Sequence, residues 1–294
     1  MKKKLKKKLP AAVLMIAMIF SMAACGNSDG GQGSAEGGAD PINVISREDG
    51  SGTRGAFVEL MGIMTDDVDH TTPSAEISQS TSVVMTTVAG NKSAIGYISL
   101  GSLDDSVKAV SVDGTVPSAD AVKAGEYTVA RPFEVITNDK LSDLAADFIT
   151  YIMSGEGQAI IAEEGYISTD EAAPAYEERS GLSGKIVLAG STSVAPVMQV
   201  LADSYKAIYG GVEIEIQQTG SGAGITSTIE KACDIGMSSR RLKPEELAEG
   251  LTETTIAMDG IAVIVNKANA IDSLTSEEIR QIFTGEVTDW SEVQ

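Results

Sequence analysis

Short apolar runs alternate with amphipathic stretches along the chain after residue 40. Apolar runs of this kind predict buried strands, and apolar residues spaced by three and four predict helices. Residues 143–153 illustrate the second case, because Leu144, Phe148 and Ile152 fall on one helical stripe. The alternation indicates an α/β fold. Strands are predicted at 42–46, 94–99, 133–137, 185–189, 212–217, 234–237, 253–258 and 261–265, and helices at 51–61, 80–89, 143–153, 155–164, 193–209, 221–231 and 276–283.

The amino-terminal region has a different pattern. Six lysines precede an uninterrupted apolar run over residues 11–20. This run is too short to span a bilayer, which takes about 20 apolar residues, but it suits the hydrophobic region of a signal peptide. We predict a signal peptide over 1–24, followed by a flexible tether over 25–40 that is rich in small and polar residues.

Acidic residues outnumber basic ones by 42 to 22. Six of the basic residues precede Cys25, so a chain that begins at Cys25 carries 16 basic and 42 acidic residues, a net charge of −26. Such acidity argues against nucleic acid as a partner, because a basic surface is needed to meet phosphates. A bound anion would have to be captured by local groups, since the overall field repels it.

Three segments share one local plan, in which a strand is followed by a turn of small residues and then by a helix. They cover residues 49–54, 189–196 and 219–224. The first backbone amides of a helix lack intrahelical partners, and the aligned peptide dipoles leave roughly half a positive charge there. Glycines let an anion approach the backbone, and hydroxyls add donors. Each segment alone is more often a simple helix cap, but together with Arg47 they predict an oxyanion site that requires no cofactor.

The three segments match one known family, and so do longer stretches at residues 95–101, 154–158, 235–240 and 259–266. The chain resembles the phosphate-binding lipoproteins of bacterial ABC importers over nearly everything after residue 40, with its two halves exchanged. Its last residues read as the sequence that should precede its first folded ones. The resemblance implies a circularly permuted, two-lobed periplasmic-binding-protein fold of type 2, in which each lobe is a mixed sheet flanked by helices and two strands form the hinge.

The domain boundaries follow from the same resemblance. One lobe is expected to combine residues 41–130 with 259–294, and the other to be continuous over 131–258. The polar stretch 171–183 is interpreted as the linker that joins the family's natural ends. A domain-swapped dimer would satisfy the same contacts, but the high effective concentration within one chain favours a monomer.

Carried over residue by residue, the resemblance implies a site of eight ligand-binding residues. Arg47 supplies the one full positive charge and is expected to be held by Asp49. Ser239 stands where the best-studied pattern has an aspartate that accepts a proton from phosphate and rejects sulfate, so the anion selectivity is left open, as is the role of Arg240. The eight residues are Arg47, Ser51, Gly52, Thr53, Thr192, Ser193, Ser221 and Ser239.

The function implied is that of a non-enzymatic lipoprotein that captures inorganic phosphate and delivers it to the permease and ATPase subunits of an ABC importer. Residues 22–25 look like a lipobox, which implies lipidation of Cys25 and anchoring on the outer face of the cell membrane. We expect no cofactor and no metal. His70 is the only histidine, and no cysteine or second histidine accompanies it.

Three alternatives remain. The same fold could bind sulfate, molybdate or tungstate, and a surface lipoprotein of this kind could sense phosphate without taking part in transport. A phosphatase or serine hydrolase would use Ser51 or Ser193, but no histidine, lysine-based dyad or metal cluster adjoins these serines, so a nucleophile would lack a base.

Overall fold

The computed structural model describes residues 40–293. Most predicted elements are present with small shifts of their ends, and the strand predicted at 94–99 is observed at Ala94–Ser99. The strands are β1 (Asn43–Arg47), β2 (Met64–Thr65), β3 (Val68–Asp69), β4 (Glu76–Ser78), β5 (Ala94–Ser99), β6 (Lys108–Ala109), β7 (Ser111–Val112), β8 (Ala130–Thr137), β9 (Ile167–Ser168), β10 (Gly184–Gly190), β11 (Val212–Gln218), β12 (Ile235–Ser238), β13 (Thr252–Val265) and β14 (Ser273–Leu274). The helices are α1 (Gly52–Leu60), α2 (Thr81–Gly90), η1 (Leu100–Ser102), α3 (Ala119–Lys123), α4 (Asp143–Ile152), α5 (Gly155–Glu163), α6 (Ala195–Ile208), α7 (Ser221–Ile229), α8 (Pro244–Leu247), α9 (Ser276–Thr284) and η2 (Trp290–Glu292).

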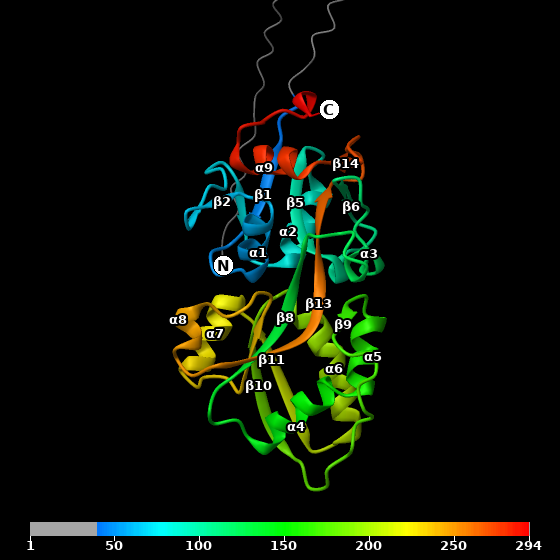
Figure 1. Cartoon of the computed structure of the whole chain (residues 1–294), viewed down its shortest axis with the longest axis vertical. Coiled ribbons are helices and arrows are strands. Elements are labelled where there is room, and N and C mark those ends of the chain that lie inside the picture. Colours follow the sequence, from blue (N-terminus) through cyan, green and yellow to red (C-terminus); the bar gives the residue numbers. More distant parts are fainter. Residues whose placement is uncertain (1–39, 294) are drawn as a thin grey trace, which may run out of the picture. The chain divides into compact units, whose positions relative to one another are not determined.

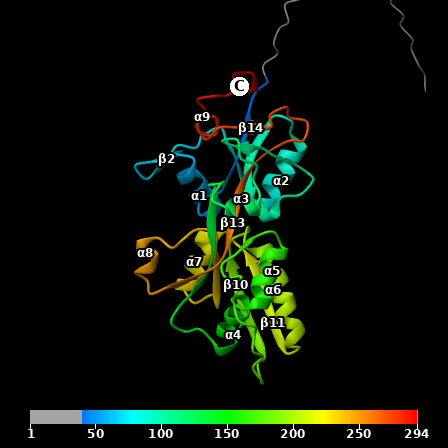
Figure 2. The same ribbon diagram turned by 45° about the vertical axis from the view of Figure 1, so that its right-hand side comes forward.

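Two long antiparallel strands, β8 and β13, join the two lobes (Figure 1). They stand in the middle of the main sheet, whose order is β11-β10-β12-β8-β13-β5-β1-β4. Helices flank the sheet, and Figure 2 shows α7 on one side of β10 with α5 and α6 on the other. This mixed sheet with flanking helices confirms the predicted fold class.

The prediction of separate strands at 253–258 and 261–265 is wrong, because β13 is continuous. The two predicted strands are separated by Asp259-Gly260, where a charged residue and a glycine interrupt the apolar run. In the structure Asp259 is buried and its carboxylate pairs with Arg131 on β8, so the ladder continues through it. Gly260 serves close packing, since a Cβ there would lie 2.9 Å from Leu100 Cδ2.

Each lobe has its own apolar core. In the first, the rings of Phe57 and Tyr97 stack with centroids 4.0 Å apart, and Phe283 of α9 meets Phe57 edge-on at 4.9 Å. In the second, Phe148 of α4 lies 5.1 Å from Tyr205 of α6. The first core therefore combines residues from both ends of the described chain, whereas the second is built from one continuous stretch.

The last residues of the described chain lie against its first residues. Ile42 N donates to Thr288 O at 2.8 Å, and Trp290 N donates to Asp40 O at 2.8 Å. The Trp290 indole adds a hydrogen bond to Ser93 O at 3.1 Å. This contact is the one that the predicted exchange of halves requires.

The predicted linker at 171–183 is ordered by polar contacts rather than by a helix or strand. Tyr176 donates to the buried carboxylate of Asp147 and lies 2.7 Å from the Tyr209 hydroxyl. Arg179 N donates to the same Tyr209 oxygen at 2.9 Å, and Gly155 N donates to Pro174 O at 2.8 Å. The segment is thereby held against α4, α5 and the end of α6.

Glu134 is a buried carboxyl group on the second-lobe part of β8. Thr255 Oγ1 donates to its Oε1 at 2.9 Å, Arg241 approaches the same oxygen at 3.6 Å, and Glu253 lies nearby. Burial raises the pKa of Glu134 to about 7, and the neighbouring Glu253 carboxylate adds to the rise. The folded state therefore binds this proton more tightly than the unfolded chain does.

This raised pKa predicts a pH dependence of stability. Between the unfolded pKa, about 4.5, and the folded value of about 7, only the folded state holds the proton, so the free energy of unfolding falls as pH rises through that window. Glu134→Gln removes the titration and should reduce the loss of stability between pH 5 and pH 8 by about 2 kcal/mol. Denaturant unfolding at both pH values measures it. The exposed Glu245→Gln is the control, and an unchanged pH slope in Glu134→Gln would contradict the prediction.

Candidate functional site

Four helices begin around one group of buried hydroxyl side chains. Each follows a strand of the main sheet, so that the strand–turn–helix plan expected for three segments occurs four times. Two helices belong to each lobe, and their amino-terminal ends carry partial positive charge. The helices and their first residues are α1 (Gly52), α2 (Thr81), α6 (Ala195) and α7 (Ser221).

Arg47, the last residue of β1, carries the positive charge of this group and is 2% exposed. Its Nε and one terminal nitrogen donate to the two carboxylate oxygens of Glu48, both at 2.8 Å. The same terminal nitrogen donates to Thr192 Oγ1 at 3.1 Å, and the other approaches Thr81 Oγ1 at 3.4 Å. One edge of the guanidinium is therefore fixed by Glu48, while the other faces the hydroxyl groups.

Hydroxyl contacts cross from one lobe to the other. Thr53 Oγ1 of α1 lies 2.9 Å from Ser193 Oγ, and Thr81 Oγ1 lies 3.2 Å from the same atom. Ser193 N donates to Ser191 Oγ at 3.2 Å, which continues the network toward α7. These side chains are almost fully buried.

The second part of the network surrounds the start of α7. Ser191 Oγ donates to Ser239 Oγ at 3.0 Å, and Ser221 Oγ lies 3.3 Å from Ser239 Oγ. Gly52 approaches so closely that an added Cβ would lie 2.6 Å from both the Ser221 and Ser239 hydroxyl oxygens. A side chain at Gly52 would therefore fill the space in front of α7, which explains why the position requires glycine.

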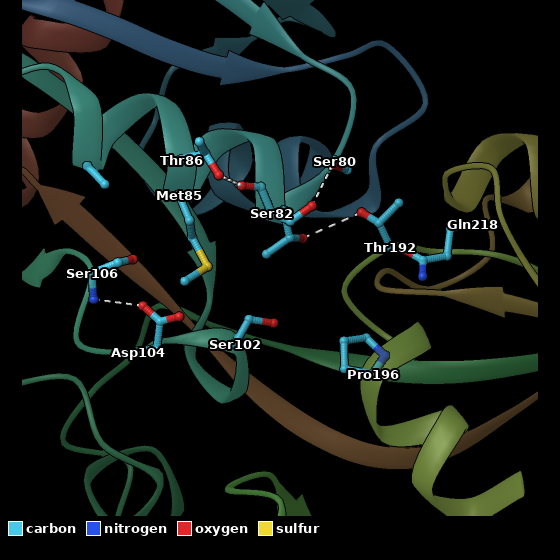
Figure 3. Close-up of a pocket in the computed structure, with 12 residues that line it drawn as sticks. Ser80, Ser82, Met85, Thr86, Ser102, Asp104, Ser106, Thr192, Pro196 and Gln218 are labelled. Carbon is cyan, nitrogen blue, oxygen red and sulfur yellow. Dashed lines mark hydrogen bonds between the residues drawn. The ribbon is translucent and has the colours of Figure 1, made fainter. Parts of the chain in front are cut away.

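A cavity of about 730 Å³ leads to this network. Thr81 and Thr192 line its inner part, and its other walls come from α2, the η1 region and the start of α6. Figure 3 shows Ser82 and Met85 on one side of it, with Pro196 and Gln218 across from them. Thr81 and Thr192 therefore connect this cavity to the hydroxyl network.

The structure places seven of the eight predicted residues in the contacts described above. Ser51, which precedes Gly52, is buried and caps α1 instead, its Oγ accepting from Arg54 N at 3.3 Å. The expectation that Asp49 holds Arg47 is wrong. The Asp49 side chain is fully exposed and pairs with Arg54 at 3.1 Å, because the chain turns after Glu48 and only Glu48 points back along the guanidinium.

Three members of the network were not predicted from the sequence. Ser191 and Glu48 adjoin predicted residues, so widening each motif by one position would have included them. Thr81 had no such signal, because the turn before α2 contains no glycine. Arg240, whose role was open, makes a two-pronged ion pair with Glu246 at 2.7 and 2.8 Å and lies in the second lobe beside α1.

This arrangement has the chemistry of an oxyanion receptor. It offers one guanidinium, several hydroxyls and four helix starts, all of which can donate hydrogen bonds to a tetrahedral anion. Tyr97 helps to fix the end of β1 that carries Arg47. Its hydroxyl lies 2.8 Å from Ser46 Oγ and accepts from Arg47 N at 3.1 Å. Burial raises the pKa of Tyr97, so the phenol stays neutral beside the site.

The amino-terminal anchor, a membrane-crossing helix and a metal site are each considered apart from this network. Cys25, the signal peptide and all but the last residue of the tether lie outside the described residues. Within residues 40–293, no helix has the length and apolar character that a membrane crossing requires. The same stretch contains no cluster of three or more His, Cys, Asp or Glu side chains arranged to hold a metal ion.

Two lobes that share a pair of strands and direct their helix starts at one hydroxyl-lined cleft define a solute-binding protein of the periplasmic type. A family model described as a PBP superfamily domain matches residues 24–156 and 169–294. The phosphate-binding protein PstS 2 of Streptococcus agalactiae is 44% identical over 288 residues, 96% of each chain. The crystal structure of a phosphate-binding protein of a phosphate ABC transporter from Streptococcus pneumoniae superposes with a TM-score of 0.69 at 45% identity, covering 86% of this chain and all of that one. The chain belongs to the PBP superfamily and, within it, to the PstS family of phosphate-binding proteins.

A third relative is matched over less than half of its length. PstS of Pseudomonas aeruginosa is 32% identical over 143 residues, which cover 46% of this chain and 43% of that protein. The Streptococcus agalactiae protein matches from end to end and so shares the order of this chain. A chain with exchanged halves is expected to match a relative in the parent order over about half of its length, as observed for this relative.

Proposed function

We propose that this protein captures inorganic phosphate in the cleft between its lobes and delivers it to an ABC importer. The observation that carries the proposal is the convergence of Arg47 and Thr53, Thr192, and Ser221 from three separate segments on one buried network. The relatives' names supply the ligand, phosphate, and the class of transporter. A binding protein of this family is not an enzyme.

The proposed working motion is closure of two lobes around the anion. One lobe comprises residues 41–130 with 259–294, and the other comprises residues 131–258. The pairing of β8 with β13 supports hinge bending near residues 130–132 and 258–260, where the strands pass from one core to the other. We propose a monomer, because the contacts between residues 40–42 and 288–290 can form within one chain. Light scattering at twice the monomer mass would contradict this.

The proposed location is the outer face of the cell membrane, with lipid on Cys25 as the anchor. Proteins of this family act outside the cytoplasm, and the lipobox-like residues 22–25 support lipidation. The partners are the permease and ATPase subunits of the importer. Labelling with a radioactive fatty acid in a bacterial host would test the anchor, since Cys25→Ser should abolish the label.

Calorimetric titration with inorganic phosphate tests the proposed function. We expect saturable binding of one phosphate per chain, because the donors are joined in one connected network. A titration without heat, repeated by equilibrium dialysis without retention of phosphate, would rule the function out.

Binding of another oxyanion is the second candidate function, and Ser239 favours it. Ser239 Oγ is surrounded by the hydroxyls of Ser191 and Ser221, so no carboxylate stands at this point to repel a fully ionised anion. A hydroxyl can donate to sulfate as readily as to phosphate. Sulfate should therefore compete with phosphate in this protein.

Ser239→Asp should increase the preference for phosphate. A carboxylate at this position accepts a hydrogen bond from protonated phosphate but repels fully ionised sulfate. The affinity for sulfate should therefore fall by roughly a hundredfold relative to the affinity for phosphate. Competition calorimetry measures the ratio. Ser239→Asn is the control of equal size without the charge. If Asn and Asp changed the ratio equally, the charge argument would be wrong.

A further inference from the structure

The amino-terminal end of α2 contacts the network although neither the sequence motifs nor the eight predicted residues include it. Thr81, the first residue of α2, is 4% exposed. Its Oγ1 lies 3.2 Å from Ser193 Oγ, 3.4 Å from a terminal nitrogen of Arg47 and 3.5 Å from Thr192 Oγ1. We infer that Thr81 is a ninth phosphate-binding residue, which donates its hydroxyl hydrogen to the anion. This inference rests on the proposed function.

The direction of the Thr81 hydroxyl follows from its neighbours. Arg47 can only donate, so the guanidinium directs a proton toward Thr81 Oγ1 and uses it as an acceptor. The hydroxyl's own hydrogen is then left for Ser193, Thr192 or an anion placed among them. A negatively charged oxygen is the stronger acceptor, because hydrogen bonds to charged groups are stronger than those between neutral hydroxyls. The Thr81 hydroxyl can therefore donate its hydrogen to the anion while it accepts from Arg47.

The local backbone supports the same role. Ser80 is the N-cap of α2, and its side chain accepts from Val83 N at 3.3 Å. The cap is thus made by Ser80, which frees the Thr81 side chain from that function. The first amides of α2 and the helix dipole add to the positive potential on this side. With Thr81 included, each lobe contributes two helix starts to the anion.

The cavity adjoins the network at Thr81. Thr81 and Thr192 are the two network residues that line it, one from each lobe. Ser221 and Ser239, at the other end of the network, do not line this cavity. Thr81 is therefore within reach of an anion that occupies the cavity beside Thr192.

Calorimetric titration of inorganic phosphate into four proteins tests this inference. Thr81→Val keeps the branched shape without the hydroxyl, and Thr81→Ser keeps the hydroxyl. Thr86→Val is the matched control, because Thr86 lies on the same helix, lines the same cavity and is exposed, with its hydroxyl bonded to Ser82 O. We expect Thr81→Val to weaken phosphate binding by roughly tenfold or more, the usual loss for a hydrogen bond to a charged group. Thr81→Ser and Thr86→Val should bind as the wild type does.

The outcomes separate this inference from the proposed function. If Thr81→Val bound phosphate with wild-type affinity while Arg47→Ala lost it, Thr81 would not be a ligand and the function would stand. If the wild type bound no phosphate, the function would fall and the role of Thr81 with it. Thermal unfolding without phosphate distinguishes a merely structural role. A Thr81→Val protein with a lowered melting temperature, and an affinity that Thr81→Ser did not restore, would also overturn the inference.

Discussion

Replacing Arg47 with alanine is expected to abolish phosphate binding in calorimetry, with a loss of roughly a thousandfold or more in affinity. Among residues 40–293, Arg47 is the one guanidinium that contacts the hydroxyl network. It is 2% exposed, so its bonds to an anion are shielded from water. Its removal also leaves the Glu48 carboxylate without its partner, 15% exposed, at the edge of the site. That negative charge would then repel the anion, which adds to the loss.

Two further variants separate these effects. Arg47→Ala combined with Glu48→Gln should recover part of the affinity, because the repelling charge is gone. Arg280→Ala is the control for net charge, since Arg280 pairs with Glu277 and Glu286 on the surface of the first lobe. Arg280→Ala should bind as the wild type does. Phosphate binding by Arg47→Ala at wild-type affinity would refute the proposed site.

Replacing Asp259 with alanine is expected to lower the free energy of unfolding by about 3–5 kcal/mol. Asp259 and Arg131 stand opposite each other on the two hinge strands, 1% and 2% exposed, with an ion-pair distance of 3.0 Å. Burial raises the pKa of Asp259 and lowers that of Arg131, so each charge depends on the other. Arg131 Nε and one terminal nitrogen already have no partner among the described residues. Without Asp259 the guanidinium would be a buried unpaired charge.

Denaturant unfolding of three variants measures this effect. Asp259→Ala combined with Arg131→Leu should regain much of the stability, because an apolar pair avoids the cost of burying charge. Asp272→Ala is the control. The Asp272 side chain pairs with Lys108 but is 85% exposed, so this ion pair should contribute about 0–1 kcal/mol to the free energy of unfolding. Equal free energies of unfolding for Asp259→Ala and Asp272→Ala would contradict the prediction that loss of the buried Asp259–Arg131 pair is strongly destabilising.

The sequence predicted the fold well because buried strands and helices have strong periodic patterns. The strand at Ala94–Ser99 has every residue buried and stands out as an apolar run. The pattern failed at Asp259, where a charged residue inside a strand resembled a break. Only its partner on β8, 128 positions away in sequence, shows that the strand continues. Long-range pairing of this kind leaves no local pattern.

The three strand–turn–helix segments could be recognised because helix starts with small residues leave a local pattern, whereas the eight individual site residues came from the family resemblance and stay a prediction. The orientation of Arg47 could not be predicted, since Glu48 and Asp49 are both acidic and the turn after β1 decides which one points back. Thr81 was missed for a related reason. A threonine at a helix start is common, and its place beside Arg47 arises from β4 pairing with β1 in the sheet.

A crystal structure of the protein grown with phosphate tests the central claim most directly. The claim is that segments far apart in sequence form one receptor, with donors from both lobes directed at a single anion. We predict one phosphate within hydrogen-bonding distance of the Arg47 guanidinium, the Thr192 hydroxyl and the residues at the start of α7. Phosphate bound elsewhere, with Arg47 and Thr192 turned to separate surfaces, would contradict the account.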